Sequence, residues 1–149
     1  MAITQEQLKG YFAAEYRVFA PDGTINLAAN GQSPQLARLH KSLGTDSSAF
    51  ITAYNPRGQQ TDEQTNRRQQ ALLVNDVTGR WSYLQGEGTD PSGIWPAEPS
   101  LLVLAISLDD ALSLGRKYRQ LAILFSAIEG STSLRACSPE DQHLLVDPT

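Results

Sequence analysis

Residues 100–128 read SLLVLAISLDDALSLGRKYRQLAILFSAI, and this stretch decides the fold. The run from Ser100 to Ile106 is the most apolar of the chain, which is typical of a strand buried on both faces. A helix is expected to begin after Ser107, a residue type that caps helices, and a second strand is expected at 121–128. A strand, a helix and a strand in succession predict a parallel, right-handed unit at the centre of a sheet.

Strand and helix patterns alternate along the rest of the chain, with hairpins expected near both ends. Capping residues and apolar residues at helical spacing predict three further helices, at about 5–16, 34–43 and 62–77, the last capped by Thr61. Strands are expected at 17–20, 25–28, 49–54, 81–84 and 132–136. These elements predict an α/β or α+β fold, a single layered domain with a mixed β-sheet and helices packed on it.

The size and composition are those of one globular domain, with 149 residues of which 40% are hydrophobic and 19% are charged. We expect the domain to span residues 1–137, and residues 138–149, with two prolines, to form a loosely held tail. The net charge of −4 does not favour general binding of nucleic acid or of an anionic membrane. The N-terminus lacks a signal-peptide pattern and no apolar run is long enough to span a bilayer, so we expect a cytoplasmic protein.

Several standard sites are excluded by the residues that the chain contains. The single cysteine, Cys137, rules out a disulfide framework and a cysteine-based zinc site, and its position favours a buried, inert thiol. The two histidines, His40 and His143, are expected to be solvated surface residues, so no metal site is predicted from histidine or cysteine. No glycine-rich phosphate loop and no GxSxG nucleophile elbow is present. Polar residues at strand ends remain as candidates for chemistry.

The first set of polar residues follows the strand at 49–54. Asn55-Pro56 ends that strand, and fourteen residues without an apolar side chain then lead into the next helix. Ligands of open α/β sheets bind where strands end and helices begin, and the free backbone N–H groups there favour an anion. A solvated helix end with a good cap is the structural alternative. The residues expected to line the crevice are Asn55, Glu63, Asn66 and Arg67.

The second set is acidic and surrounds the loop before the central strand. It consists of Glu87, Asp90 and Glu98, with Trp95 among them. Glu98 stands close to prolines on both sides, and the glycines that flank Glu87 favour a flexible segment over a packed one. These carboxylates are candidate catalytic groups, or else structural partners of a helix end or an arginine.

A series of motifs runs through both sets: AYNP at 53–56 before a polar helix, GEGTD at 86–90, a tryptophan before Glu98-Pro99-Ser100, and GRKYRQ at 115–120. In this order and spacing the series resembles a bacterial family, domain-of-unknown-function family 3293, from about Tyr11 to Arg135. The chain departs from the family pattern at Arg57, where a small polar residue is more usual, and at residues 95–97, which lengthen the segment before Glu98. The resemblance implies one compact cytoplasmic domain and implies no activity.

Binding of a small ligand is the function that these residues favour. The first set, with Gln120 and with Trp95 as a wall, would contact a polar or anionic, nucleotide-like molecule, because arginine recognises phosphate through paired hydrogen bonds. Asn55 and Glu98 share this pocket only if the strands that they end and begin run antiparallel, so we predict that arrangement.

Two alternatives stay open, and with them the question of whether the protein is an enzyme. In one, Glu98 with Glu87 or Asp90 supplies acid–base or metal-binding carboxylates, and the oxygen ligands make a divalent cation such as Mg²⁺ the expected cofactor. In the other, the protein is a regulatory interaction module whose contact surface includes Trp95 and Tyr54. The expected partner is therefore a small molecule or a protein, and not a membrane.

Overall fold

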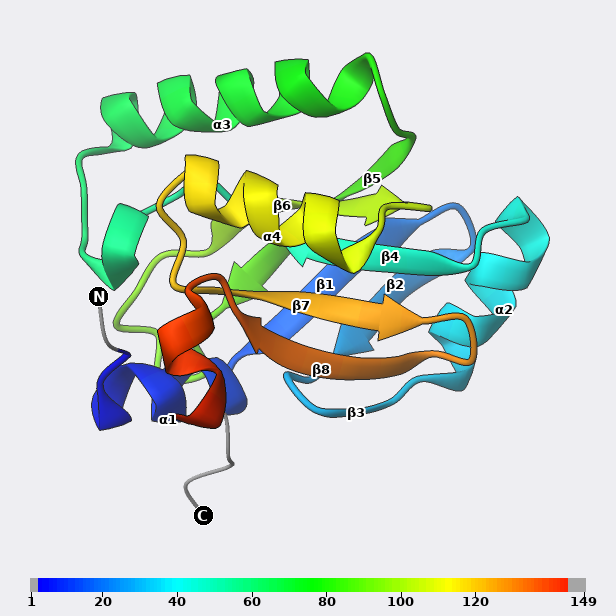
Figure 1. Ribbon diagram of the computed structural model, residues 1–149, viewed down its shortest axis with the longest axis horizontal. Coiled ribbons are helices and arrows are strands. Elements are labelled where there is room, and N and C mark those ends of the chain that lie inside the picture. The colour runs from blue at the N-terminus through cyan, green and yellow to red at the C-terminus, as the bar shows by residue number, and fades with distance from the viewer. Residues whose placement is uncertain (1–2, 145–149) are drawn as a thin grey trace.

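The computed structural model describes residues 3–144 and contains one eight-stranded sheet with helices packed on it (Figure 1). The α-helices in this range are α1 (Gln5–Ala13), α2 (Pro34–Leu43), α3 (Glu63–Thr78) and α4 (Leu108–Lys117). The strands are β1 (Glu15–Ala20), β2 (Gly23–Leu27), β3 (Gly31–Gln32), β4 (Ser47–Ile51), β5 (Tyr83–Thr89), β6 (Glu98–Leu104), β7 (Ala122–Ala127) and β8 (Ser131–Ala136). Two 3₁₀ helices, η1 (Pro56–Gly58) and η2 (Pro139–Leu144), follow β4 and β8. The predicted layered α+β domain is confirmed.

The strand order is β2-β1-β5-β6-β4-β7-β8-β3, and every neighbouring pair within the described residues is antiparallel. The prediction of a mixed sheet is therefore wrong. β6 and β7 both pair with β4 and therefore run in the same direction, as the predicted strand–helix–strand unit requires. They are not neighbours, because β4 lies between them. The helical crossover through α4 spans one position of the sheet, and an earlier strand of opposite direction fills it.

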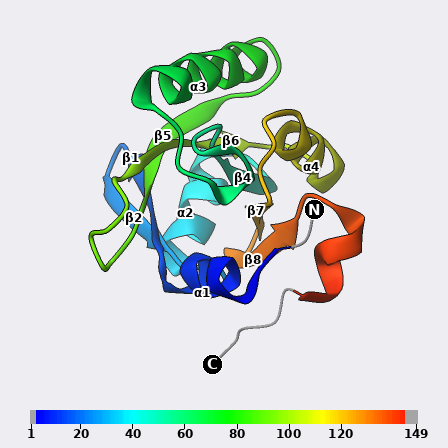
Figure 2. The ribbon, with the colours of Figure 1, turned by 90° about the vertical axis from the view of Figure 1, so that its left-hand side faces the viewer.

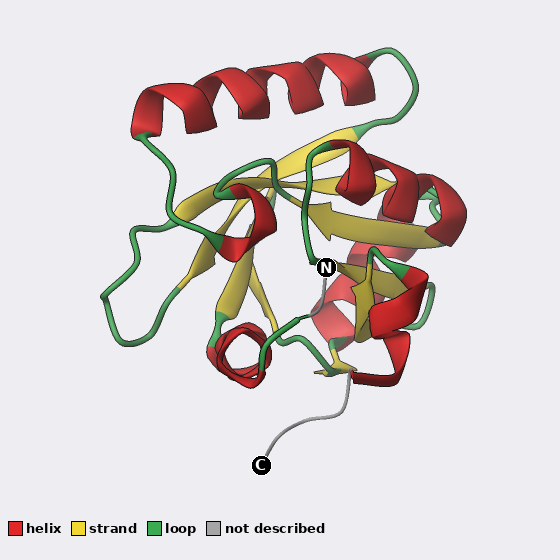
Figure 3. Ribbon diagram, turned by 60° about the vertical axis from the view of Figure 1, so that its left-hand side comes forward, coloured by secondary structure: helices red, strands yellow, loops and turns green. Residues whose placement is uncertain are grey.

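The sheet is strongly curved, and each of its faces carries a separate hydrophobic core (Figure 2, Figure 3). The inner core includes Val18 and Phe50 of the sheet and Leu36 of α2. The outer core includes Leu73 of α3 and Leu114 of α4, because these two helices cover the opposite face. At the end beside α1, residues of the inner core line a cavity.

The central strand β6 contributes to both cores. Leu102 and Leu104 belong to the inner core, whereas Leu101 and Val103 belong to the outer core. All four side chains are buried. The prediction of a central strand that is buried on both faces is confirmed, and the alternation follows from the two-residue period of a strand.

The predicted N-caps are present on three helices and wrong on the fourth. The side-chain acceptors at the starts of α1, α2 and α4 are Thr4, Ser33 and Ser107. Asp62, and not Thr61, caps α3, and its carboxylate accepts a hydrogen bond from the Thr65 amide at 2.9 Å. The Thr61 amide is instead bound to the Asn55 side chain at 3.0 Å, which holds this residue outside the helix. An acidic cap also suits the positive end of the helix dipole.

Strand β5 extends through the Gly-Glu-Gly segment that was expected to lie in a flexible loop. Gly86 pairs with Val18 on one side and with Ser100 on the other. A Cβ atom at Gly86 would lie 2.3 Å from the backbone oxygen of Arg17. The glycine is therefore required for close packing of β5 against β1, and the prediction of a flexible segment is wrong.

His40 is buried, which contradicts the prediction of a solvated surface residue. Its Nε2 lies 2.8 Å from Ser48 Oγ, and its Nδ1 lies 3.2 Å from the carbonyl oxygen of Ile128. Both ring nitrogens thus find partners, one on β4 and one in the turn after β7, which removes the cost of burying them. The side chain of His143 lies outside the described residues.

The chain after β8 turns into η2, which packs on β8. Cys137 is buried, as predicted, and burial raises the pKa of its thiol to about 12. The boundary expected after residue 137 stays a prediction, and residues 145–149 of the expected tail lie outside the described residues. Within the described part of the chain, no helix has the length and apolar character needed to span a bilayer.

Candidate functional site

A cavity of about 420 Å³ opens at the end of the sheet where α1, the end of β4 and the loop at 90–97 meet. Much of its lining comes from the inner core, including Tyr16, Phe50 and Leu124. Asn55 and Glu98 supply polar groups. The volume falls in the range of roughly 300–1,000 Å³ that small-molecule sites occupy. The hollow is therefore large enough for a ligand and is mostly apolar.

The antiparallel pairing of β4 with β6 builds the polar wall of this cavity. Ile51 near the end of β4 pairs with Leu101 near the start of β6, so the two segments beyond them meet at one edge of the sheet. The Asn55 amide Nδ2 donates a hydrogen bond to the Glu98 carboxylate at 2.6 Å. The predicted antiparallel arrangement of these strands is confirmed.

Asn55 is held by contacts that use its whole side chain. Its Oδ1 accepts hydrogen bonds from the Thr61 amide at 3.0 Å and from Asn66 Nδ2 at 2.9 Å, while its backbone N–H donates to Asn66 Oδ1. Its φ of 48° is in the left-handed region, which asparagine adopts more readily than most residues. The amide that faces Glu98 is thus fixed in orientation.

The polar start of α3 is explained by the segment that leaves β4. Asn66 and Gln70 are buried on the side of α3 that faces this segment. Gln70 Oε1 accepts a hydrogen bond from the Ala53 amide at 2.9 Å, and Asn66 binds both the backbone and the side chain of Asn55. Beyond the end of β4, side chains of α3 replace the partners that a neighbouring strand would supply.

The remaining residues of the first set lie outside the cavity lining. Glu63 and Arg67 form an exposed ion pair at 3.2 Å, and Glu63 also accepts a hydrogen bond from the Tyr54 hydroxyl at 2.8 Å. Asn66 stands behind Asn55 and does not line the cavity. Of the four residues expected in the crevice, the structure places only Asn55 on its wall. Tyr54 is buried, so the prediction that it forms part of an exposed contact surface is wrong.

The acidic set is separated by its partners. Glu98 lines the cavity, and burial raises the pKa of its carboxyl, although the hydrogen bond from Asn55 opposes this shift. Glu87 lies outside the lining and contacts Arg17 on β1 at 3.4 Å. Asp90 lies on the rim, and its carboxylate accepts hydrogen bonds from the Ser92 hydroxyl and from amides of its own loop, which lower the pKa of its carboxyl.

These carboxylates do not fit a shared magnesium site as they lie here. Glu87 is engaged by Arg17, and Asp90 by Ser92 and the loop backbone. Among the described residues, no group of three or more His, Cys, Asp or Glu side chains is placed to hold a metal ion. A divalent cation such as Mg²⁺ therefore stays a prediction. The arrangement of the residues around Glu98 does not favour it.

Trp95 and Gln120, which were predicted to contact a ligand, both line the cavity. Trp95 is partly exposed on the loop, and its amide is held by Asp90 at 3.0 Å. Gln120 donates from Nε2 to the Tyr54 carbonyl at 3.1 Å, so it also closes the segment after β4. A role for either residue in binding stays a prediction.

Two tyrosines in the lining were missed by the sequence. The Tyr16 hydroxyl donates to the Tyr11 carbonyl at 2.8 Å, and burial, with Glu98 as a smaller contribution, raises the pKa of both phenols well above the usual range. In the sequence, Tyr11 is recognisable only as an apolar position of a helix. The spacing does not indicate which part of the sheet that helix covers, so it could not place Tyr11 in a cavity. Both phenols stay neutral and can act as hydrogen-bonding groups.

The charge of the lining is negative. Three carboxylates, Glu6, Asp90 and Glu98, face the cavity or its rim, and no arginine or lysine is among the described residues that line it. Arg67, the expected phosphate contact, points into the exposed ion pair instead. The electrostatic character of this hollow is therefore opposite to that of an anion site.

Comparison with known proteins identifies a family and no characterised relative. The family described as "Protein of unknown function (DUF3293)" matches residues 51–123, a narrower range than the one from Tyr11 to Arg135 that the motifs suggested. No curated protein and no solved structure matches the chain. The matched range begins at the end of β4 and runs through Asn55, Glu98 and Gln120 to the start of β7, so it includes much of the polar wall of the cavity.

Proposed function

The chain belongs to the DUF3293 family, and we propose that it binds in the cavity beside α1 a small, partly apolar molecule that is neutral or positively charged. The observation that carries this proposal is the half-buried carboxylate of Glu98 in an otherwise largely apolar hollow. Asn55 orients it at 2.6 Å, and no basic residue in the described lining neutralises it.

The charge of the lining decides between ligand classes. A carboxylate that is partly removed from water gains most from a charge-assisted hydrogen bond with a cation or from a neutral N–H or O–H donor. An anionic group beside Glu98 and Asp90 would be repelled. This supports a neutral or cationic ligand over the nucleotide-like anion that the sequence favoured.

A thermal-shift screen of small aromatic and aliphatic amines, amides and alcohols, with nucleotides as the anionic arm, tests the proposal. A bound compound stabilises the folded state by about 2.7 kcal/mol when its concentration is one hundred times Kd. We expect stabilisation by amines or neutral compounds and at least tenfold weaker binding to Glu98→Gln.

The matched control is Glu87→Gln, which removes a carboxylate from the neighbouring strand outside the cavity lining. Its affinity should equal that of the unaltered protein. Stabilisation by nucleotides alone, or equal binding by the Glu98→Gln and unaltered proteins, would refute a ligand anchored on Glu98.

A second candidate function is acid–base catalysis by Glu98. Burial raises the pKa of this carboxyl, which brings it closer to the range in which a group both gives and takes a proton. The Tyr11 ring lines the same cavity and offers a neutral hydroxyl. If a bound compound is converted, mass spectrometry should detect the product, and Glu98→Gln should slow its formation at least a hundredfold. Compounds that are recovered unchanged after long incubation would leave binding alone.

We also propose a cytoplasmic setting, which the single and buried Cys137 supports. A regulatory protein partner stays a prediction. It is supported by the rim of the cavity, where Ile94 is 78% exposed beside the partly exposed Trp95.

A further inference from the structure

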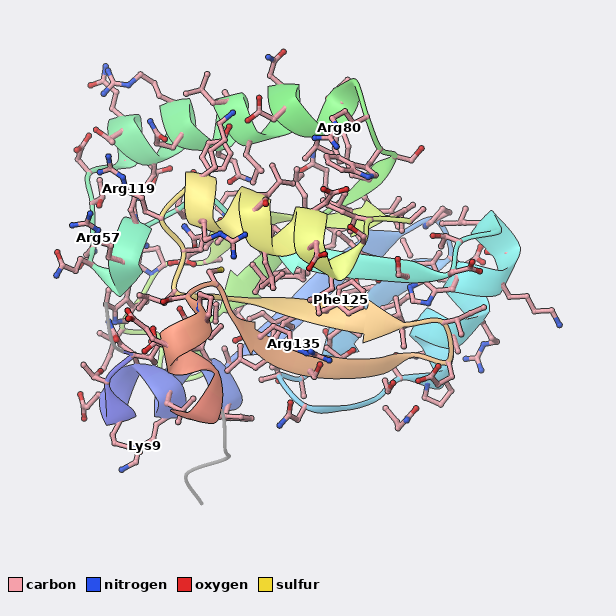
Figure 4. All side chains as sticks on the ribbon, viewed as in Figure 1. Lys9, Arg57, Arg80, Arg119, Phe125 and Arg135 are labelled. Atoms are coloured by element: carbon pink, nitrogen blue, oxygen red, sulfur yellow. The ribbon has the colours of Figure 1, made fainter. Side chains whose placement is uncertain are left out.

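Three arginines from two segments that are far apart in the sequence line a second, smaller hollow. Arg57, Arg116 and Arg119 share this hollow of about 160 Å³ with Asp141 of η2. Figure 4 places the labelled Arg57 and Arg119 near each other at the end of the molecule where β4 and α4 end. Gln120 lines both hollows, so it stands between the arginines and the cavity described above.

The backbone at two of these arginines is strained. Arg57 has a φ of 61° and Arg119 a φ of 58°, both in the left-handed region that disfavours residues with a Cβ atom. The Arg57 amide donates to the Arg119 carbonyl at 2.7 Å, which locks the two turns together. Strain of this kind in non-glycine residues is often found at functional sites.

The two guanidinium groups are not used in holding the fold. Neither Arg57 nor Arg119 makes a side-chain hydrogen bond or an ion pair with another described residue. Arg116, in contrast, donates to the Cys137 carbonyl at 2.9 Å, which fixes its position beside them. Two guanidinium groups are therefore free to contact a ligand.

Asp141 gives the hollow a second and opposite requirement. Its side chain is 2% exposed, and its Oδ2 is buried without a hydrogen-bond partner among the described residues. A buried acceptor without a donor is costly, and nearly all such groups in proteins are satisfied. A ligand that suits this hollow therefore carries negative charge on the side of the arginines and one hydrogen-bond donor on the side of Asp141.

We propose that this hollow binds a phosphate group that carries one proton. Its unprotonated oxygens would accept hydrogen bonds from Arg57 and Arg119, and its P–OH would donate to Asp141 Oδ2. At about 30 Å³ for each water, the volume corresponds to roughly five waters, which is enough for an ion of five heavy atoms. This site does not depend on the ligand proposed for the larger cavity.

Sulfate distinguishes this proposal from a general attraction of anions. It has the shape of phosphate and carries no proton at neutral pH, so it offers no donor to Asp141. Isothermal titration with inorganic phosphate and with sulfate, at equal ionic strength, should give at least tenfold tighter binding of phosphate. Equal affinity for the two ions would overturn the proposal.

Variants assign the two requirements to their residues. The double variant Arg57→Asn with Arg119→Asn removes both charges. Both side chains are exposed, and asparagine tolerates the left-handed backbone conformation of these two positions. The variant should weaken phosphate binding at least tenfold. Asp141→Asn should tighten sulfate and reduce the preference for phosphate to less than about threefold, because its amide can donate. Arg38→Asn, at an exposed position on α2, is the control and should bind like the unaltered protein. A double arginine variant that binds phosphate normally would also overturn the proposal.

Phenyl phosphate separates the free ion from the phosphoryl group of a larger molecule. A phosphomonoester loses its last proton with a pKa of about 6, so its P–OH is present below that pH and mostly absent at pH 7.5. If a monoester is the natural ligand, phenyl phosphate should bind at least as tightly as inorganic phosphate at pH 5.5 and more weakly at pH 7.5. Binding of inorganic phosphate with rejection of phenyl phosphate at both pH values identifies the free ion.

Discussion

At the scale of single residues, Asn55 joins three parts of the molecule through one amide. Its Nδ2 holds Glu98, and its Oδ1 accepts hydrogen bonds from Thr61 and Asn66. Few side chains could do this, because the amide both donates and accepts and because asparagine tolerates left-handed backbone. The same residue therefore orients the candidate anchor and clamps the loop before α3.

Replacement of this residue should cost stability. We expect Asn55→Ala to lower the free energy of unfolding by about 2–4 kcal/mol, because buried polar groups lose their partner and alanine is disfavoured in the left-handed region. Urea unfolding measures the change. Asn75→Ala, at an exposed position of α3, is the control and should change the value by less than about 0.5 kcal/mol. A loss below about 1 kcal/mol for Asn55→Ala would contradict the clamp.

The raised pKa of Glu98 predicts a definite pH dependence. The folded state binds this proton more tightly than the unfolded state, so stability should fall as pH rises from about 4.5, the ordinary pKa of this carboxyl, through the raised pKa of the folded state. Glu98→Gln should remove this contribution and make the stability of the variant fall less over that window. Urea unfolding at a series of pH values tests it, with Glu87→Gln as the control. If the curves of unfolding free energy against pH are parallel for Glu98→Gln and the unaltered protein, burial does not raise the pKa of this carboxyl.

At the scale of elements, the packing of β5 against β1 depends on a glycine. A Cβ atom at Gly86 would collide with the backbone oxygen of Arg17 at 2.3 Å, whereas at Gly88 the nearest atom, in the Tyr16 ring, is 3.8 Å away. Two glycines in one strand, two residues apart, thus face very different surroundings. Only one of them is required by sterics.

Substitution of these glycines tests that difference. Gly86→Ala should destabilise the protein by about 1–3 kcal/mol or more, because the strand or its partner must move. Gly88→Ala should be nearly neutral, since its surroundings have room for a methyl group. Thermal or urea unfolding of the two variants gives the comparison, and equal stabilities would contradict the assigned packing.

At the scale of the whole molecule, one curved sheet divides two cores. Its inner face closes on α1 and α2, and its outer face packs under α3 and α4. Because the inner core does not fill the open end of the sheet, the cavity and the core share residues such as Phe50 and Leu124. Stability and the shape of the candidate site are therefore coupled through the inner core.

Truncation within the inner core should be costly. Leu104→Ala removes a buried side chain from the central strand and should lower the free energy of unfolding by about 2–5 kcal/mol. Leu72→Ala is the control, because Leu72 is 53% exposed on α3 and its loss should cost less than about 1 kcal/mol. Similar losses for both variants would mean that β6 does not form the centre of the core.

The sequence alone determined most of the elements and the class of the fold. Apolar runs and capping residues identified the four helices, and the continuous apolar character of Leu101 to Leu104 identified the strand that both cores share, because a strand alternates its side chains between two faces. It also pointed to Asn55 and Glu98, since polar residues beside strands and prolines stand out from an apolar background. These inferences rest on neighbours in the chain, which a sequence displays directly.

Only the tertiary structure decided which of these residues meet. The insertion of β4 between β6 and β7 brought Asn55 to Glu98, whereas Glu87 on β5 is engaged by Arg17 of β1 outside the cavity lining. Burial of His40 depends on partners from β4 and from the distant turn after β7. The gathering of arginines beside Asp141 brings together chain segments that are more than eighty residues apart in the sequence, as from Arg57 to Asp141. Strand order is set by the summed packing of the whole chain, and no local pattern of residues encodes it.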